Sequence, residues 1–407
     1  MGINFNIVKK PKEEDDGEEL EEETVEETKE TTSKEYDPKK KMIRFMGIIV
    51  IVMVILLIIL FFASLGKKGS STYSYSQLES ILEKAGKSYF KDHPSYLPED
   101  DGDVVEVVDT TLVAEGKMND LSEYPTKDGT TCNGSVKVTL ENDTYLYSPI
   151  LNCGDKYSTV SLNSKVLSNE DVVTTGDGLY SRNGEYIFRG ENVNNYIMLD
   201  KSLWRIVKIT ANDELVLINE EGVGYTTSWD NRYNEQMRYD AGINNYSVSR
   251  IKDYLNEVYT NPDKNNNELI ISKKDKSRMV SYNVCIGKRS STSESKNNEE
   301  ECKQTLKNQK IGLLTLSDFL YASVDPNCKS ADSRSCANYN YLVMNDNWWL
   351  VTASSENTYD VFKVQNGGSV VVDSASNYAL TRPVIHLNSD VLYNGGKGTL
   401  EKPYKVR

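Results

Sequence analysis

The sequence predicts an α+β protein that is held in a membrane by one helix and carries most of its chain on one side of that membrane. The apolar run Phe45–Leu65 contains no charged residue. All six cysteines follow this run, and none precedes it. Beyond the run, alternating segments typical of antiparallel strands are interspersed with a few amphipathic helices.

The apolar run is long enough to cross a lipid bilayer. At 1.5 Å per residue a helix over Phe45–Leu65 is about 30 Å long, which matches a hydrocarbon core of about 30 Å. A cleaved signal peptide is the alternative, but its apolar core is typically about 7–15 residues long and no acidic tail precedes it. More cations precede the run than follow it, which favours a cytoplasmic N-terminus. We therefore expect a single-pass transmembrane helix over residues 42–66, with the bilayer as its partner.

Residues 1–41 form a charged tail. Between Glu13 and Glu30 the charges are negative except for Lys29. Such a segment repels itself and buries nothing, so we expect a disordered cytoplasmic tail, either inert or used for docking. The formal net charge of the whole chain is −14, which argues against a nucleic-acid partner, because phosphate binding needs clustered Lys and Arg.

The cysteines indicate an oxidising, extracellular location for the residues beyond the membrane. An even number of cysteines confined to one side is typical of disulfides. Zinc is the alternative, but the chain has no C-x-x-C pair and only two histidines, His93 and His386. Proximity in the sequence favours the pairs Cys132–Cys153, Cys285–Cys302 and Cys328–Cys336.

Residues 72–162 read as a small helix-plus-sheet module. Apolar residues recur at helical spacing between Ser76 and Phe90. The alternating runs Ser135–Leu140 and Thr144–Leu151 read as a hairpin whose open end Cys132–Cys153 would clip. Residues from about 45 to 160 resemble the type IV pilins and pseudopilins in this order of elements. The chain departs from pilins in its long segment before the apolar run and in having no glutamate within that run.

Residues 175–407 read as a second extracellular domain rich in strands. A hairpin is predicted over Leu203–Glu221 with its turn at Asn212-Asp213. A helix over Val248–Tyr259 is expected to have Ser247 as N-cap. The remaining expectations are strands at 184–190, 195–200, 312–316 and 382–387, a short helix capped by Ser317, and a type I′ hairpin centred on Asn366-Gly367.

Three short motifs in this second domain carry a further resemblance: Trp204-Arg205, Trp348-Trp349-Leu350 and Arg382-Pro383-Val384. Residues from about 184 to 390 resemble an uncharacterised family of surface domains from gut Firmicutes. That family is distantly similar to formylglycine-generating enzymes and to C-type-lectin-like domains. The resemblance implies an irregular α+β domain and no known activity. Formylglycine-generating enzymes need a reactive cysteine pair that holds copper, whereas these cysteines pair as structural bridges, so oxidase activity is disfavoured.

Calcium is the one cofactor that the sequence raises. Sugar-binding C-type lectins use a calcium site near a Trp-Asn-Asp sequence, and this chain has "WDN" at 229–231 and "NDNW" at 345–348. Calcium needs several convergent oxygens, which short acid and amide clusters supply. A solvated loop is the favoured interpretation of both pieces, so no cofactor is predicted.

Catalytic patterns are sparse. The chain has no G-x-x-x-x-G-K-[ST] loop and no G-x-S-x-G elbow. His386 lies in a terminal strand, where a packed or edge histidine is the favoured interpretation over a general base. A pair of carboxylates for glycoside hydrolysis is the remaining option, but no pair stands out. The sequence therefore favours a non-catalytic protein.

The paired tryptophans pose the central functional question. Neighbouring residues on a strand face opposite sides, so one of Trp348 and Trp349 points inward and the other is either core or free to stack on a ligand. Arg382 either ties strands together or grips a ligand. The residues expected at a ligand face are Trp229, Asp230, Asn345, Asp346, Asn347, Trp348 and Arg382.

We therefore predict a membrane-anchored surface protein whose ectodomain binds an extracellular ligand, such as a glycan, a wall component or a protein, in adhesion. One alternative is a structural component of an envelope or pilus-like assembly. The other is a surface hydrolase with an unidentified carboxylate pair.

Overall fold

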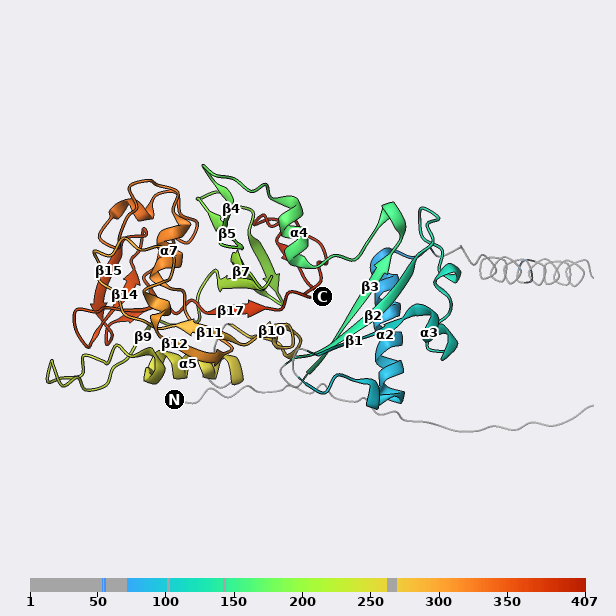
Figure 1. The fold of residues 1–407 in the computed structure, drawn as a ribbon, viewed down its shortest axis with the longest axis horizontal. Coiled ribbons are helices and arrows are strands. Elements are labelled where there is room, and N and C mark those ends of the chain that lie inside the picture. Colours follow the sequence, from blue (N-terminus) through green and yellow to red (C-terminus); the bar gives the residue numbers. More distant parts are fainter. Residues whose placement is uncertain (1–52, 54, 56–71, 101–102, 142–143, 262–268) are drawn as a thin grey trace, which may run out of the picture. The chain divides into compact units, whose positions relative to one another are not determined.

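The computed structural model describes residues 53, 55, 72–100, 103–141, 144–261 and 269–407 (Figure 1). The expected acidic tail, almost all of the expected membrane span and the turn at Asn142-Asp143 lie outside these residues. No helix within the described residues has the length and apolar character to cross a membrane. Residues 70–407 form one compact unit. Its buried apolar side chains fall into two clusters, and the boundary expected between residues 162 and 175 stays a prediction.

The first cluster lies between a helix and a three-stranded antiparallel sheet. Helix α2 (Tyr75–Asp92) starts with a capping box, in which Ser74 accepts from the Gln77 N–H and the Gln77 side chain bonds back to Ser74. Leu78, Leu82 and other apolar residues of α2 are buried against the sheet. The sheet has the order β1-β2-β3, with strands β1 (Val104–Val108), β2 (Asn133–Glu141) and β3 (Thr144–Asn152). Short elements complete the module: α3 (Asp109–Ala114), η1 (Pro94–Tyr96), η2 (Leu121–Glu123) and η3 (Gly154–Lys156).

The second cluster surrounds an eight-stranded sheet with the order β10-β17-β8-β7-β5-β4, in which β6 pairs with β7 and β18 pairs with β6. Every pairing is antiparallel except that of β18 with β6. All five residues of β8 are buried, as expected for a central strand covered on both faces. The strands are β4 (Gly178–Arg182), β5 (Glu185–Arg189), β6 (Tyr196–Leu199), β7 (Ser202–Ile209), β8 (Leu215–Asn219), β10 (Met279–Val280), β17 (Val384–Leu387) and β18 (Tyr404–Lys405).

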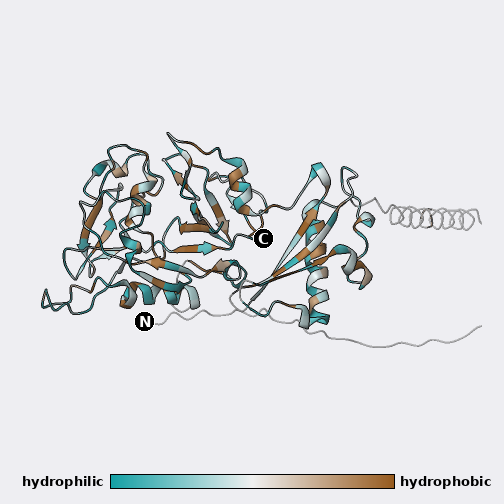
Figure 2. Cartoon of the chain, viewed as in Figure 1, coloured by the Kyte–Doolittle hydropathy of each residue, from teal (hydrophilic) through white to brown (hydrophobic). Residues whose placement is uncertain are grey.

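Three smaller sheets and several short helices extend this core. Figure 2 shows that strands carry much of the chain's hydrophobic sequence, whereas connecting loops and much of α5 are hydrophilic. The small sheets are β13 (Trp348–Ala353) with β14 (Asp360–Val364) and β15 (Val370–Ser374), β11 (Tyr282–Cys285) with β12 (Thr305–Gln309), and β9 (Thr227–Ser228) with β16 (Tyr378–Ala379). The helices are α4 (Leu162–Asn169), α5 (Arg250–Thr260), α6 (Lys273–Lys276), α7 (Leu316–Ala322), η4 (Tyr246–Val248), η6 (Glu301–Lys303) and η7 (Arg334–Ala337).

The α+β class is confirmed, and several antiparallel sheets are present. Three disulfides are also present, Cys132–Cys153, Cys285–Cys302 and Cys328–Cys336. These are the pairs that proximity in the sequence favoured. Small disulfide-bonded modules are typical of extracellular proteins, so the folded part of the chain has the character of an extracellular domain.

Several local expectations are wrong in detail. Helix α5 is capped by Ser249, not by Ser247, which lies in the preceding turn η4. Helix α7 is capped by Thr315, two residues earlier than the expected Ser317, and residues 312–316 form only a single bridge at Gly312. In both cases the cap is the serine or threonine whose extended backbone directly precedes the first helical residue, and spacing alone does not select it.

The hairpin near Asn366 is real, but its turn is not type I′. Strands β14 and β15 are paired through a longer loop, and the positive φ values belong to Gly367 and Gly368. A type I′ turn needs positive φ at both of its central residues, here Asn366 and Gly367. Asn366 therefore does not adopt the left-handed backbone that a type I′ turn would require of it.

Candidate functional site

Trp229 and Asp230 are structural. The Trp229 ring is fully buried and its Nε1–H donates to the Leu350 carbonyl at 3.0 Å. Asp230 is also fully buried, and its carboxylate accepts from the backbone N–H groups of Ile243 and Arg250 at 3.0 and 3.2 Å. Arg232 adds an ion pair at 2.6 Å. The oxygens of Asp230 are therefore occupied, and the expected role of this pair in ligand binding is corrected.

Both tryptophans of β13 belong to the core. Trp348 and Trp349 are each fully buried. Trp348 lies against Phe319 of α7 with ring centroids 5.8 Å apart, and the Trp349 Nε1–H donates to the Thr227 carbonyl at 2.8 Å. The expectation that Trp348 stacks on a ligand is wrong, because β13 is covered on both faces.

Asn345, Asp346 and Asn347 are exposed in the loop before β13. Asn347 supports neighbouring loops, since its Oδ1 accepts from the Asn366 N–H at 2.9 Å. The seven residues expected at one ligand face therefore divide into a buried set and an exposed loop. They do not form one surface.

Arg382 ties segments together, one of the two roles considered for it. Its guanidinium is buried and donates to the carbonyls of Asn219 and Leu342 at 2.9 and 3.0 Å. It also pairs with Glu220 at 3.2 Å and lies 4.8 Å from the Trp348 ring. Burial lowers the pKa of Arg382 to about 10, with Glu220 opposing that shift, so the group remains cationic at neutral pH. Through Glu220 this arginine supports the floor of an open cleft.

That cleft, which we call the tyrosine–arginine cleft, has a volume of about 620 Å³. Volumes of this order are usual for ligand sites. It is formed by β6, β7, the residue after β8 and the loop that follows η7. Its lining residues are Glu191, Tyr196, Arg205, Glu220, Ala337, Asn338, Tyr339, Asn340, Tyr341 and Val343.

Arg205 lies at the centre of the cleft between two aromatic rings. Its guanidinium is 4.0 Å from the centroid of Tyr196 and 4.7 Å from that of Tyr341. Tyr196 is placed there by strand register, because it is the cross-strand partner of Arg205 in the β6–β7 pair. The Nε–H of Arg205 donates to the Asn195 Oδ1, and an NH1 proton donates to the Tyr196 hydroxyl, both at 2.7 Å. Arg205 is thus held in one orientation.

Glu220 joins the two arginines at the cleft floor. One of its oxygens lies 3.6 Å from Arg205 and the other 3.2 Å from Arg382. The Glu220 side chain remains 26% exposed, so its acceptor capacity is open to the cleft. Burial raises the pKa of Tyr196, with Arg205 opposing, so this hydroxyl stays protonated at neutral pH. The cleft therefore offers neutral, anionic and cationic polar groups next to aromatic faces.

One wall of the cleft is held rigid by buried bonds. The Cys328–Cys336 disulfide precedes it directly. The Asn340 side chain donates to the Phe319 and Cys336 carbonyls at 3.0 and 2.9 Å. Asn338 donates to the Asp325 carboxylate at 2.7 Å, and this bond is the main reason that the pKa of Asp325 is lowered. A wall fixed in advance loses little conformational entropy when a ligand binds.

Two tyrosines of this wall differ sharply. Tyr339 is 57% exposed and has a φ of +48°, a left-handed backbone that is uncommon for an aromatic residue. Tyr341 is buried, and its hydroxyl has no hydrogen-bond partner within the described residues. Burial raises the pKa of Tyr341. Unusual backbone geometry and unsatisfied buried polar atoms are both features that cluster at functional sites.

A second cavity, of about 330 Å³, contains His386. The His386 Nδ1 lies 2.9 Å from the Glu214 Oε2, and the His386 ring stacks on Tyr282 with ring centroids 3.8 Å apart. Burial lowers the pKa of His386, with Glu214 opposing. Lys208 in the same cavity pairs with Glu185 at 3.1 Å and Asp318 at 3.6 Å. His386 is thus a packed histidine on a strand, which is the interpretation that its sequence context favoured.

The charges of the second cavity are largely satisfied by one another. Burial opposes ionisation of Asp318, yet Lys208 and bonds from Thr315 and Asn298 outweigh it and lower its pKa. Burial likewise opposes the charge on Lys208, but Asp318 and Glu185 raise its pKa overall. Among the residues that the structure describes, no three His, Cys, Asp or Glu side chains are grouped to hold a metal ion. The tyrosine–arginine cleft, which keeps open polar groups, is the stronger candidate.

The fold and its bridges define a disulfide-bonded α+β protein with a preformed polar cleft and the character of an extracellular domain. Comparison with known proteins adds no name: no family model, no curated protein and no solved structure matches this chain.

Four residues of the cleft were not predicted from the sequence: Tyr196, Glu220, Tyr339 and Tyr341. A signal was present in "CANYNY", where asparagine alternates with tyrosine directly after a cysteine. Such a stretch has the turn formers of a loop and the amphipathic rings that are common at binding surfaces.

Proposed function

We propose that this chain is a single-pass, membrane-anchored surface protein whose ectodomain binds an extracellular glycan in the tyrosine–arginine cleft without catalysis. The observation that carries this proposal is the placement of Arg205 between Tyr196 and Tyr341, beside the exposed ring of Tyr339. The proposed kinship with the Firmicutes surface-domain family fits this site, because Arg205 belongs to one of the motifs on which that resemblance rests.

A glycan suits the chemistry of the cleft. Sugar rings have apolar faces that stack on tyrosine, and hydroxyl groups that both donate and accept hydrogen bonds. The cleft provides a ring in Tyr339 and an acceptor in Glu220, while the side-chain amides of Asn338 and Asn340 hold its wall in place. Of the residues that line the cleft, Glu191 and Glu220 are acidic and Arg205 is basic, which favours a neutral ligand over a polyanion.

The binding test uses the full-length chain in lipid nanodiscs on a glycan array, followed by affinity measurement for each hit. Tyr339→Asn removes the exposed ring and keeps a residue that accepts positive φ. Losing one stacking contact is expected to weaken binding roughly twofold to tenfold. Tyr225→Ala is the matched control, because Tyr225 is 80% exposed and lies outside the cleft. No glycan hit, or equal losses in both variants, contradicts the proposal.

The two alternatives have separate readouts. Self-assembly that depends on residues 45–90 would favour an envelope or pilus-like component. Turnover of a glycan that one Asp or Glu substitution abolishes would favour a hydrolase. Binding that is lost with Tyr339→Asn, without turnover or assembly, supports the non-catalytic proposal.

The proposed orientation is tested on intact cells. With the N-terminus in the cytoplasm, added protease digests the residues after the span and leaves the acidic tail intact. Thiol alkylation before reduction leaves all six cysteines unmodified, because they are paired. A protected ectodomain, or six alkylated cysteines, contradicts an extracellular location.

A further inference from the structure

Strand β1 forms an open edge of the three-stranded sheet. The sheet order β1-β2-β3 leaves β1 paired on one side only, among the described residues (Figure 1). An open edge is a template on which another extended chain adds as a strand.

The register identifies the backbone groups that face this open edge. The Leu140 N–H donates to the Asp103 carbonyl, and Val104 is opposite Thr139 in an antiparallel ladder. In such a ladder, hydrogen-bonded pairs alternate with pairs whose N–H and C=O groups point away from the partner. Val104 and Glu106 therefore direct these groups outward, and no hydrogen bond to them from outside the ladder is present within the described residues.

A groove runs beside this edge. It has a volume of about 850 Å³ and is bounded by the end of α2, the segment from Ser95 to Asp100, and β1. Apolar side chains are unusually open along it, since Val104 and Val108 are each 47% exposed and Tyr96 is 58% exposed. The groove therefore offers apolar contacts as well as unpaired main-chain groups.

Charge determines which kind of strand fits. The groove is rimmed by the carboxylates Glu99, Asp100, Asp103 and Glu106, and no Lys or Arg among the described residues lines it. A second copy of β1 pairing antiparallel about its centre would place Glu106 opposite Glu106, and like charges directly opposite are destabilising. A strand with lysine or arginine at alternate positions would meet these carboxylates favourably.

We propose that β1 is a docking edge for an extended basic segment of another protein, which adds as a fourth strand of this sheet. Main-chain hydrogen bonds to Val104 and Glu106 supply affinity, and the carboxylate rim selects basic side chains. This interaction is independent of the proposed glycan cleft, which is formed by other strands.

The probe is a blocked heptapeptide of alternating lysine and valine, added to the full-length chain in nanodiscs and followed by fluorescence anisotropy. A glutamate–valine peptide is expected to bind at least about tenfold more weakly. A lysine–valine peptide with methylated backbone nitrogens keeps its charge but loses the ladder bonds, and is also expected to bind about tenfold more weakly. Hydrogen exchange at the Glu106 amide slows when the unmethylated peptide binds.

Two variants test the edge itself. Glu106→Lys weakens the lysine peptide about tenfold, and Val104→Pro weakens it similarly by removing an outward N–H from the first residue of the strand. Asp155→Lys is the control, because Asp155 is exposed in the same module and does not line the groove. Absence of binding overturns the proposal. If the methylated peptide binds equally well, charge attraction alone explains binding. If the chain forms a dimer that protects β1, a second copy occupies the edge. Either result also overturns the proposal.

Discussion

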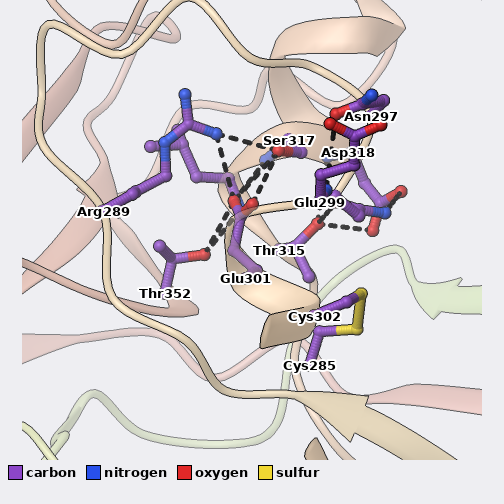
Figure 3. The surroundings of a disulfide bond; sticks show 12 residues. Cys285, Arg289, Asn297, Glu299, Glu301, Cys302, Thr315, Ser317, Asp318 and Thr352 are labelled. Carbon is purple, nitrogen blue, oxygen red and sulfur yellow. Dashed lines mark hydrogen bonds and ion pairs between the residues drawn. A yellow bond between two sulfur atoms is a disulfide. The ribbon is translucent and has the colours of Figure 1, made fainter. Parts of the chain in front are cut away.

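The buried ion pair between Arg289 and Glu301 provides the sharpest test of the energetics of the fold. Both side chains are fully buried, and an NH1 proton of Arg289 faces the Glu301 Oε1 at 3.2 Å (Figure 3). Glu301 also accepts from the Ser317 N–H at 3.1 Å, and Arg289 donates to the carbonyls of Ser293 and Ser295 at 2.8 and 2.9 Å. The pair thus fixes the loop closed by Cys285–Cys302 against α7.

Glu301→Gln keeps the shape of this site but leaves the Arg289 charge buried without a counter-ion. Removing one partner of a buried pair costs about 3–5 kcal/mol, a large part of the roughly 5–15 kcal/mol that stabilises a typical domain. Urea unfolding with the disulfides intact, followed by tryptophan fluorescence, measures this loss. Glu299→Gln, at an exposed position of the same loop, should change the unfolding free energy by less than about 0.5 kcal/mol.

The double variant Arg289→Met/Glu301→Leu separates the pair's contribution from the cost of an orphaned charge. Replacing both partners with apolar side chains is often neutral or stabilising, so this variant should recover at least about 2 kcal/mol relative to Glu301→Gln. A loss below about 1 kcal/mol for Glu301→Gln, or a double variant no more stable than the single one, would refute the reasoning.

Three further outcomes follow from buried groups. Burial lowers the pKa of His386. Its contribution to stability is therefore present above the pKa of the unfolded state, about 6.5, and is lost as the pH falls through the lower pKa of the folded state. His386→Gln should flatten the pH dependence of the unfolding free energy measured in urea. Tyr341→Phe should raise the unfolding free energy by about 1 kcal/mol, because the hydroxyl has no hydrogen-bond partner among the described residues. A lower unfolding free energy would instead reveal a hydrogen bond that the free protein makes. The double variant Cys328→Ser/Cys336→Ser should lose about 2–3 kcal/mol of unfolding free energy, because the disulfide closes a short loop, and it should also bind glycan more weakly. The control variant Cys132→Ser/Cys153→Ser should lose stability but keep its affinity for glycan.

Local patterns predicted the parts of the fold that depend on neighbouring residues. The alternation in 203–221 predicted the β7–β8 hairpin, and the predicted turn residue Asp213 has a left-handed φ of 62°. Helix α2 and the β2–β3 hairpin also lie where periodicity placed them. The caps of α5 and α7 were misplaced because several serine and threonine residues precede each helix, and backbone geometry chooses among them.

The cleft could be predicted only in part, because most of its residues meet through tertiary packing. Tyr196 and Arg205 are paired by the β6–β7 hairpin, so their proximity could have been worked out from the turn between two recognised strands. Glu220 and Tyr341 are brought to the same cleft by strand order and by a loop whose Tyr341 N–H donates to the Gly190 carbonyl. The local sequence around Glu220 or Tyr341 does not indicate that the two residues line the same cleft.

The tryptophans show why residue type was a poor guide to the binding surface. Trp348 and Trp349 begin a strand that continues with Leu350 and Val351, and all four are buried because α7 covers one face and β9 lies against the other. A strand whose six residues are all buried has no reason to leave a ring in solvent. Tyr339, by contrast, has polar neighbours and a strained backbone that the Cys328–Cys336 bridge helps to hold. An exposed ring needs such support to stay in place without partners, so the context of an aromatic residue indicates its role better than its size does.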